Sequence, residues 1–275
     1  MDKTGLCVVT GASSGIGKAL AEALAAAGYR VLGTSRKPPA PPVGSSSAPQ
    51  AFEWAALDLT LADSVEALAR SLADRNERIS LLVNNAGYAA MGPLAALGRN
   101  ELERQFQANL IGPLSLTAAL LPRMSRGSVV VDIGSVSGEV TTPFAGAYCA
   151  SKAALHAADD ALRMELEPLG VHVVSVRAGG VRSSFGQQAL ERAFKPPAGS
   201  PFAPFAKGIE ARAMESQKDA MAPELLAALL LRALERKVPP RVFRVGPRSW
   251  SLPLLERLLP GKVLDRVLQK KYGLR

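Results

Sequence analysis

A glycine-rich turn between a buried strand and a helix is the feature that most narrows the fold of this chain. Leu6–Thr10 is a short apolar run rich in β-branched residues, which is typical of a buried strand. Residues 11–17 follow with glycines at GxxxGxG spacing, and 18–27 has the pattern of a helix that ends at Gly28. Residues 30–34 give a second strand, so the segment predicts a βαβ unit. Such a turn lets backbone N–H groups at a helix N-terminus approach a pyrophosphate, although the glycines alone would also suit an ordinary turn.

Strands and helices keep alternating beyond this unit. Their alternation predicts an α/β fold, a doubly wound parallel sheet with helices on both faces, in one catalytic domain over 1–249. The segment 37–50, rich in proline and serine, is expected to be a mobile surface loop within it. Clusters of polar and glycine residues follow the carboxyl ends of the strands, where such sheets bind ligands. Strands are predicted over 52–57, 80–83, 128–133, 171–176 and 242–246, and helices over 61–75, 99–124, 147–169 and 223–236.

Composition limits the classes of protein to which the chain could belong. With 48% hydrophobic and 21% charged residues among 275, it can bury a sizeable core. The formal charge of +9 is spread without a basic stripe between aromatics, so nucleic-acid binding is not expected. Two cysteines and no apolar run of spanning length suggest a cytoplasmic protein with reduced thiols. His156 and His172 lack metal-ligand spacing and are interpreted as a helix-surface and a strand residue, so no metal is expected.

Tyr148 and Lys152 stand four residues apart in the predicted helix 147–169, hence on one face, one turn apart. A phenol has a pKa near ~10, and a fixed ammonium beside it would lower that value. A tyrosine tuned in this way can give a proton to a carbonyl oxygen or take one from an alcohol. The pair by itself is weak, because the same spacing arises by chance in many helices.

The glycine-rich turn and the tyrosine–lysine pair occur together with three further motifs. The full set is the stretch 10–17, Asn84-Asn85-Ala86-Gly87, Asn109, Ser135, and Tyr148 with Lys152. In their order and spacing these motifs resemble those of the classical short-chain dehydrogenase/reductase family. The resemblance implies a Rossmann-type sheet of about seven strands and NAD(P)(H)-dependent interconversion of an alcohol with a ketone or aldehyde. The C-terminal extension is loosely similar to that of members acting on steroids, retinoids and other lipids.

The resemblance assigns catalytic roles to four residues. Tyr148 would be the general acid in reduction and the base in oxidation, and Ser135 would hold the substrate oxygen beside it. Lys152 would lower the tyrosine pKa and bond the nicotinamide ribose. Asn109 would lie at a helix distortion that holds a relay water. Taken singly, Asn109 and Ser135 would be better interpreted as a helix-surface amide and a strand-end cap; the set of four favours catalysis.

The residue after the second predicted strand indicates which nicotinamide cofactor binds. NAD sites place an acid there for the ribose 2′-hydroxyl, whereas Arg36 suits a 2′-phosphate, so NADP(H) is predicted; a solvated turn is the alternative. Two positions depart from the family pattern without losing a needed group, since Ala178 replaces a usual proline and Ser183 a common threonine. Asp58 is expected to bond the adenine amino group. The cofactor-binding residues implied are Gly11, Ser13, Ser14, Gly15, Ile16, Gly17, Arg36, Asp58, Leu59, Asn85, Ala86, Gly87, Tyr148, Lys152, Gly179, Val181 and Ser183.

Residues 184–222 are expected, by the same resemblance, to form a lid over the substrate. Their apolar side chains suggest an apolar pocket, although burial in the core would explain them as well. No arginine pair or carboxylate clamp for a charged substrate stands out. The substrate would be a steroid-, retinoid-, lipid- or polyketide-like carbonyl or alcohol; a 3-oxoacyl-type reductase and a non-catalytic NADP-binding regulator are the alternatives. The predicted pocket residues are Tyr88, Met91, Val140, Phe144 and Phe185.

Two further segments bear on partners. Helix 147–169 is apolar over more than one face, which predicts a homodimer or homotetramer. The extension 250–275 is amphipathic, with leucines among arginines and lysines. It could cover that helix face, cover the pocket, join an oligomer or lie on a membrane surface, and packing onto its own domain is the favoured interpretation.

Overall fold

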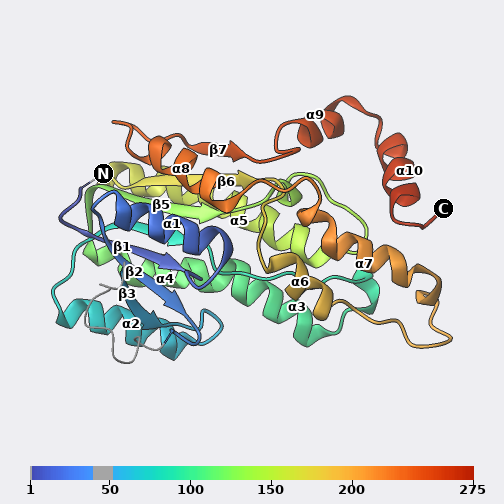
Figure 1. Ribbon diagram of the computed structural model, residues 1–275, viewed down its shortest axis with the longest axis horizontal. Helices are drawn as coiled ribbons and strands as arrows, with labels where there is room; N and C mark the ends of the chain where they lie inside the picture. Colours follow the sequence, from blue (N-terminus) through green and yellow to red (C-terminus); the bar gives the residue numbers. More distant parts are fainter. Residues whose placement is uncertain (1, 40–51) are drawn as a thin grey trace.

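A seven-stranded sheet forms the centre of the computed structural model, which describes residues 2–39 and 52–275 (Figure 1). All neighbouring strands are parallel, in the order β3-β2-β1-β4-β5-β6-β7. The carboxyl ends of the strands therefore share one edge, and the predicted doubly wound α/β fold is confirmed. The strands are β1 Leu6–Thr10, β2 Arg30–Ser35, β3 Glu53–Ala56, β4 Ile79–Asn84, β5 Met124–Ile133, β6 His172–Ala178 and β7 Val242–Val245.

Helices cover both faces of the sheet. Alternate residues of β1 show how, because Cys7 and Val9 join the core cluster with α1 and α8, whereas Leu6 and Val8 join the cluster with α2 and α4. The second face is completed by α5, which packs Leu166 against Val130 of β5. The helices are α1 Gly15–Ala26, α2 Ala62–Asp74, α3 Arg99–Phe106, α4 Gly112–Leu120, α5 Gly146–Leu166, α6 Phe185–Glu191, α7 Ala206–Met214, α8 Pro223–Leu234, α9 Ser251–Leu258 and α10 Gly261–Lys271.

The helix predicted over 99–124 is a helix with an interruption, and its predicted end is wrong. Between α3 and α4 the chain forms a π-helical turn over Gln107–Ile111, and the N–H of Gly112 bonds the carbonyl of Gln107. Pro113 has no N–H with which to bond the carbonyl four residues earlier, which is the physical reason for a wider turn here. The helical stretch ends in a 3₁₀ turn at Leu121–Arg123, because Met124 already begins β5.

The segment 184–222 and the C-terminal tail form a cap at one end of the molecule. Residues 184–222 hold α6 and α7, and the tail forms α9 and α10, which lie beside α7 in Figure 1. The tail is anchored by Tyr272, which is 3% exposed and packs with Leu268 in a core cluster that includes Ile209 of α7. A Cβ on Gly208 would lie 2.1 Å from the Tyr272 carbonyl oxygen, so a glycine is needed where the tail crosses α7.

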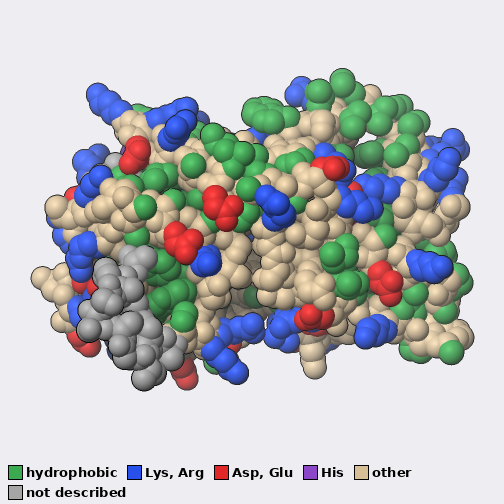
Figure 2. Space-filling view, viewed as in Figure 1, with side chains coloured by type: hydrophobic (Ala, Val, Ile, Leu, Met, Phe, Trp, Pro, Cys, Tyr) green, Lys and Arg blue, Asp and Glu red, His purple; other side chains and the backbone are tan. Residues whose placement is uncertain are grey.

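The tail thus packs onto its own domain, and it leaves the outer face of α5 uncovered. Ala150, Ala153 and Ala157 of that face are exposed. Hydrophobic side chains gather on the surface over α9 and α10 (Figure 2), and Trp250 and Leu258 are among the exposed residues of the tail. The membrane contact expected from the sequence stays a prediction, which vesicle flotation would test. Within residues 2–39 and 52–275 no helix is both long and apolar enough to cross a bilayer. Most of the predicted loop 37–50 lies outside the described residues.

Candidate active site

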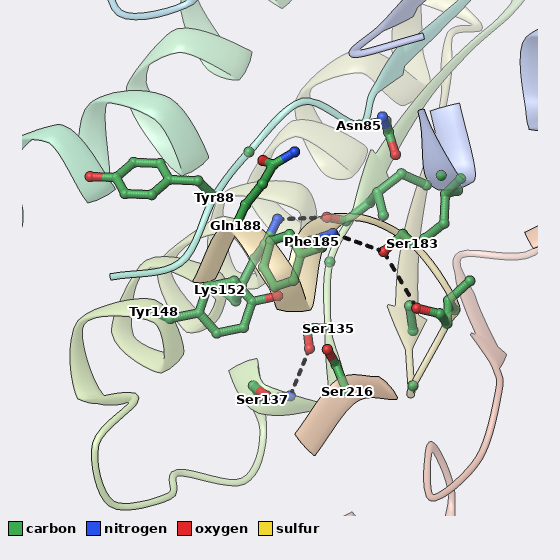
Figure 3. A pocket seen from close by; sticks show the side chains of 18 of the residues that line it. Asn85, Tyr88, Ser135, Ser137, Tyr148, Lys152, Ser183, Phe185, Gln188 and Ser216 are labelled. Carbon is green, nitrogen blue, oxygen red and sulfur yellow. Dashed lines mark hydrogen bonds between the residues drawn. The ribbon is translucent and has the colours of Figure 1, made fainter. Parts of the chain in front are cut away.

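One cavity of about 410 Å³ runs along the carboxyl edge of the sheet. Its wall begins at the glycine-rich turn after β1, passes the ends of β2, β4, β5 and β6, and finishes at α7 and the C-terminal tail. Residues far apart in sequence meet here because each follows the end of a parallel strand. Figure 3 shows the middle of this cavity, with Tyr148, Lys152, Ser135 and Ser183 around it.

The turn after β1 has the open backbone expected for a phosphate cradle. Gly11 and Gly15 have φ of +66° and +56°, and a Cβ on Gly15 would lie 2.8 Å from the Cβ of Ser183. Gly17 does not line the cavity. A Cβ on it would lie 2.4 Å from both Asn85 Nδ2 and Gly11 O, so it serves the close approach of α1 to the turn rather than ligand contact. Apart from Gly17, all residues predicted to bind the cofactor line this cavity.

Arg36 and Asp58 lie together at the end of the cavity beyond the glycine turn. Asp58 Oδ1 accepts bonds from the Thr60 N–H at 2.9 Å and the Thr60 hydroxyl at 2.7 Å. Burial works against ionisation of Asp58, but the Thr60 bonds and the charge of Arg36 outweigh it and hold its pKa below the ordinary value. A carboxylate and a guanidinium therefore face the same space, one to accept a hydrogen bond and one to hold an anion.

Tyr148 and Ser135 lie close together at the centre of the cavity (Figure 3). Ser135 follows β5 and its Oγ accepts the Ser137 N–H at 3.1 Å, while Tyr148 lies in the first turn of α5 and is 8% exposed (Figure 3). Burial raises the pKa of Tyr148, and the Ser135 hydroxyl and the charge of Arg212 oppose that rise. The phenol is consequently protonated at neutral pH and can donate.

Lys152 lies in the cavity wall with Tyr148, and its effect on the tyrosine pKa stays a prediction. Its Nζ donates to the carbonyl oxygen of Ile133 at 2.6 Å. Burial lowers the pKa of Lys152 itself to about 8, against the opposing charges of Asp132 and Asp159. The ammonium thus lies in the cavity wall one turn from the tyrosine, directed to the end of β5.

Asn109 lies in the π-helical turn, at the distortion that the resemblance implied, but it does not line the cavity. Its Nδ2 donates to the Tyr88 carbonyl at 3.0 Å and to Ser151 Oγ at 3.1 Å, and its Oδ1 accepts the Tyr88 N–H at 3.1 Å. These bonds fix the loop after β4, which carries Asn85 to Tyr88 along the cavity wall. In this structure Asn109 stabilises the loop that forms this part of the cavity wall. Its role in holding a relay water stays a prediction.

A buried polar cluster lies behind Lys152, and it corrects the interpretation of His156. His156 is 6% exposed, its Nε2 lies 3.5 Å from the Ser135 N–H, and burial, with Arg177, lowers its pKa to about 3. It is not a helix-surface residue, because it follows Lys152 by four residues and so shares the inner face of α5. The pKa of Asp159 on the same face is raised by burial and by the charge of Asp132, so this pair retains a proton at neutral pH.

On the substrate side the structure confirms cavity positions for Tyr88, Met91, Val140 and Phe185 but not for Phe144. Phe144 has a φ of +62° and turns into the core cluster, where its ring centroid lies 6.4 Å from that of Phe205. The lid residues Phe194, Phe205 and Ile209 belong to or pack against the same cluster. Burial in the core, the alternative left open by the sequence, explains these side chains.

The sequence analysis missed the charged residues of the cap. Arg212, Glu215, Arg248 and Lys271 all line the cavity, although no charged clamp stands out in the sequence. Glu215 Oε1 lies 2.6 Å from both Arg248 Nη1 and Lys271 Nζ. These residues come from α7 and the turn after it, from the segment that follows β7, and from α10. Because only the fold brings these segments together, no spacing in the sequence predicts the cluster.

Comparison with known proteins agrees with this architecture. A family model described as short chain dehydrogenase matches residues 6–193. The chain is 35% identical over 266 residues to the uncharacterized oxidoreductase YbbO of Escherichia coli K12, covering 95% of this chain and 93% of that protein. It is 31% identical to the NADPH-dependent 3-dehydrocapnine reductase of Ornithobacterium rhinotracheale, over 96% and 95% of the two chains.

The fold is also close to that of a solved structure. The crystal structure of a short-chain dehydrogenase from Streptomyces avermitilis has a TM-score of 0.79 and 30% sequence identity, covering 99% of this chain and 97% of that one. The match includes the part of the chain that holds the C-terminal tail.

Proposed function

The chain belongs to the short-chain dehydrogenase family, oxidoreductases that use a nicotinamide cofactor, and on that premise we propose that it interconverts a ketone or aldehyde and an alcohol with NADP(H). The observation that carries the proposal is that the Tyr148 phenol and Ser135 share one cavity with the glycine turn and Arg36. A general acid and an anion site at two ends of one cavity are the groups that a nicotinamide-dependent carbonyl reductase requires.

The residues present fit a dinucleotide. The space between the turn and Ser183 is open only because position 15 lacks a Cβ, and Asp58 offers an ionised carboxylate for the adenine amino group. When bound, the nicotinamide supplies or accepts the hydride. In reduction Tyr148 donates its proton to the carbonyl oxygen, and Ser135 donates a hydrogen bond that orients that oxygen. Lys152 would hold the ribose hydroxyls.

We propose that the site works in the direction of reduction. The NADPH-dependent relative named above is a reductase, which supports this direction. In reduction the protonated phenol of Tyr148 would serve as the acid, whereas oxidation of an alcohol would need the phenolate first. Tyr148, Ser135 and Lys152 are all in the cavity wall, which disfavours a regulator without turnover.

The cavity wall supports a substrate with an apolar body. Met91, Phe185, Leu252, Leu264 and Leu268 line the part beyond Tyr148, and the last three come from the tail. The relative named a 3-dehydrocapnine reductase supports a substrate that is reduced with NADPH, and a 3-oxoacyl substrate is the second candidate.

A panel assay tests the proposed function. NADPH oxidation would be followed with long-chain ketones, a steroid ketone, retinal and a 3-oxoacyl thioester. We expect turnover with apolar carbonyl compounds. Tight NADPH binding with no oxidation by any of them would instead support the non-catalytic regulator.

We also propose that the protein is a homo-oligomer assembled through the outer face of α5. Light scattering at micromolar concentration is expected to give a multiple of 28.9 kDa. The exposed alanines of α5 would let a second copy approach closely, so Ala157→Arg is expected to reduce the mass, whereas Ala26→Arg on exposed α1 surface is the matched control. A monomeric wild type would refute the assembly, and an unchanged Ala157→Arg oligomer would refute its place.

A further inference from the structure

A buried arginine from the cap enters the cavity beside the reactive tyrosine. Arg212 of α7 is 6% exposed and lines the cavity together with Tyr148. Its Nε donates to Thr142 Oγ1 at 2.6 Å and its Nη2 to Ser137 Oγ at 3.4 Å. The N–H of Ser137 in turn donates to Ser135 Oγ at 3.1 Å. Two hydrogen bonds, through Ser137, therefore connect the guanidinium to Ser135, the residue proposed to orient the substrate oxygen. The charge of Arg212 also acts on the Tyr148 phenol.

This guanidinium has no carboxylate partner in the part of the chain that the structure describes. None lies within 4.0 Å of it, although Glu215 follows on the next turn. Glu215 is already bonded to Arg248 and Lys271, each at 2.6 Å. The buried Arg177 and the half-buried Arg244 differ, because both pair with Glu139, at 3.4 and 2.6 Å.

A buried cation without an anion is costly unless a partner arrives, since removal from water penalises the charged group. Two hydroxyl groups satisfy part of the guanidinium, and among residues 2–39 and 52–275 its Nη1 donates to no protein acceptor. A planar guanidinium with a free edge facing a cavity matches the geometry of a carboxylate, sulfonate or phosphate.

We propose that Arg212 binds an anionic oxygen group carried by the substrate close to its reacting carbonyl. The proposal rests on the proposed function and specifies its substrate as an amphipathic keto compound. The acidic head would face Arg212, Ser137 and Thr142. The apolar chain would extend along Leu252, Leu264 and Leu268 of the tail. A neutral steroid or retinoid would leave the guanidinium unpaired.

A bracing role is the competing explanation. Arg212 could serve only to tie α7 to the loop that carries Thr142, in which case removing the charge would weaken all ligands alike. Ligand pairs that differ only in charge separate the two roles, because a bracing residue does not distinguish an acid from its neutral analogue.

Binding is measured first, by calorimetry with octanoate and the neutral octanamide on the protein saturated with NADP⁺. We expect wild type to prefer octanoate and Arg212→Gln to weaken octanoate binding about tenfold or more, with a much smaller effect on octanamide. Arg212→Lys, which keeps the charge, should retain part of the affinity. Arg232→Gln, on the exposed surface of α8, is the matched control. Equal loss for acid and amide, or octanoate binding unchanged by Arg212→Gln, would overturn the proposal.

Turnover gives an independent measurement. The ratio of kcat/KM for 4-oxodecanoate to that for its methyl ester should favour the acid in wild type and fall about tenfold or more in Arg212→Gln. A wild type that reduces both compounds equally overturns the anion site while leaving the reductase function standing. A wild type that reduces no carbonyl compound but binds octanoate through Arg212 overturns the function and supports the anion site.

Discussion

Replacing Tyr148 with phenylalanine is expected to lower kcat by about 10²- to 10⁴-fold, the contribution typical of a positioned general acid. The change removes only the phenolic oxygen. The ring is buried in a core cluster with Ala189 and Ile209, and its centroid lies 5.7 Å from that of Phe185, so phenylalanine keeps the packing. NADPH binding should be nearly unchanged, because the glycine turn and Arg36 lie elsewhere along the cavity.

Single-turnover and steady-state rates of NADPH oxidation would be compared with NADPH affinity from fluorescence titration. Tyr29→Phe is the matched control, since Tyr29 is similarly buried, at 6% exposed, and its hydroxyl bonds Glu235 at 3.2 Å, outside the cavity. That variant should keep wild-type rates. A Tyr148→Phe enzyme within tenfold of wild type would contradict the role of the phenol as proton donor.

The parts of the site that follow buried strands could be predicted from the sequence. Ser135, Asn85 and Asp58 each stand within two residues of the end of a strand, and a parallel sheet brings all such ends to one edge. Helix periodicity likewise placed Tyr148 and Lys152 on one face of α5. The same periodicity would have placed His156 and Asp159 there too, had it been applied to them, because they continue the row at steps of four and three residues.

The cap could not be predicted in the same way. Its residues take their positions from packing between α7, the tail and the loop around Thr142, contacts that join distant parts of the chain. Phe144 shows the difficulty, because the sequence places it beside the pocket whereas its positive φ turns it into the core. Arg212 is the opposite case, because nothing in the sequence places it in the cavity. Only the contacts in the fold show that it lines the cavity and has no carboxylate partner among the described residues.

Changing Arg36 to aspartate is expected to reverse the choice of cofactor. Wild type should have the higher kcat/KM with NADPH than with NADH, because Arg36 follows β2, where a 2′-phosphate would lie, with no acid beside it in the sequence. An aspartate there would repel the phosphate and accept a bond from a 2′-hydroxyl. Losing a charge-assisted bond of about 1.5–3 kcal/mol and adding repulsion should shift the ratio of the two kcat/KM values by roughly 10²-fold or more.

Two further variants test whether Arg36 acts by direct contact with the 2′-phosphate or only through the overall charge of the turn. Arg36→Gln removes the attraction without adding repulsion, so its ratio should fall between those of wild type and Arg36→Asp. Lys37→Asp adds the same acid one residue further along, at an exposed position that does not line the cavity, and it should shift the ratio far less. Equal use of both cofactors by wild type, or equal shifts from Arg36→Asp and Lys37→Asp, would mean that Arg36 is a solvated turn residue. A shift confined to Arg36 would require direct contact, because solvent screening weakens a distant surface charge at both positions alike.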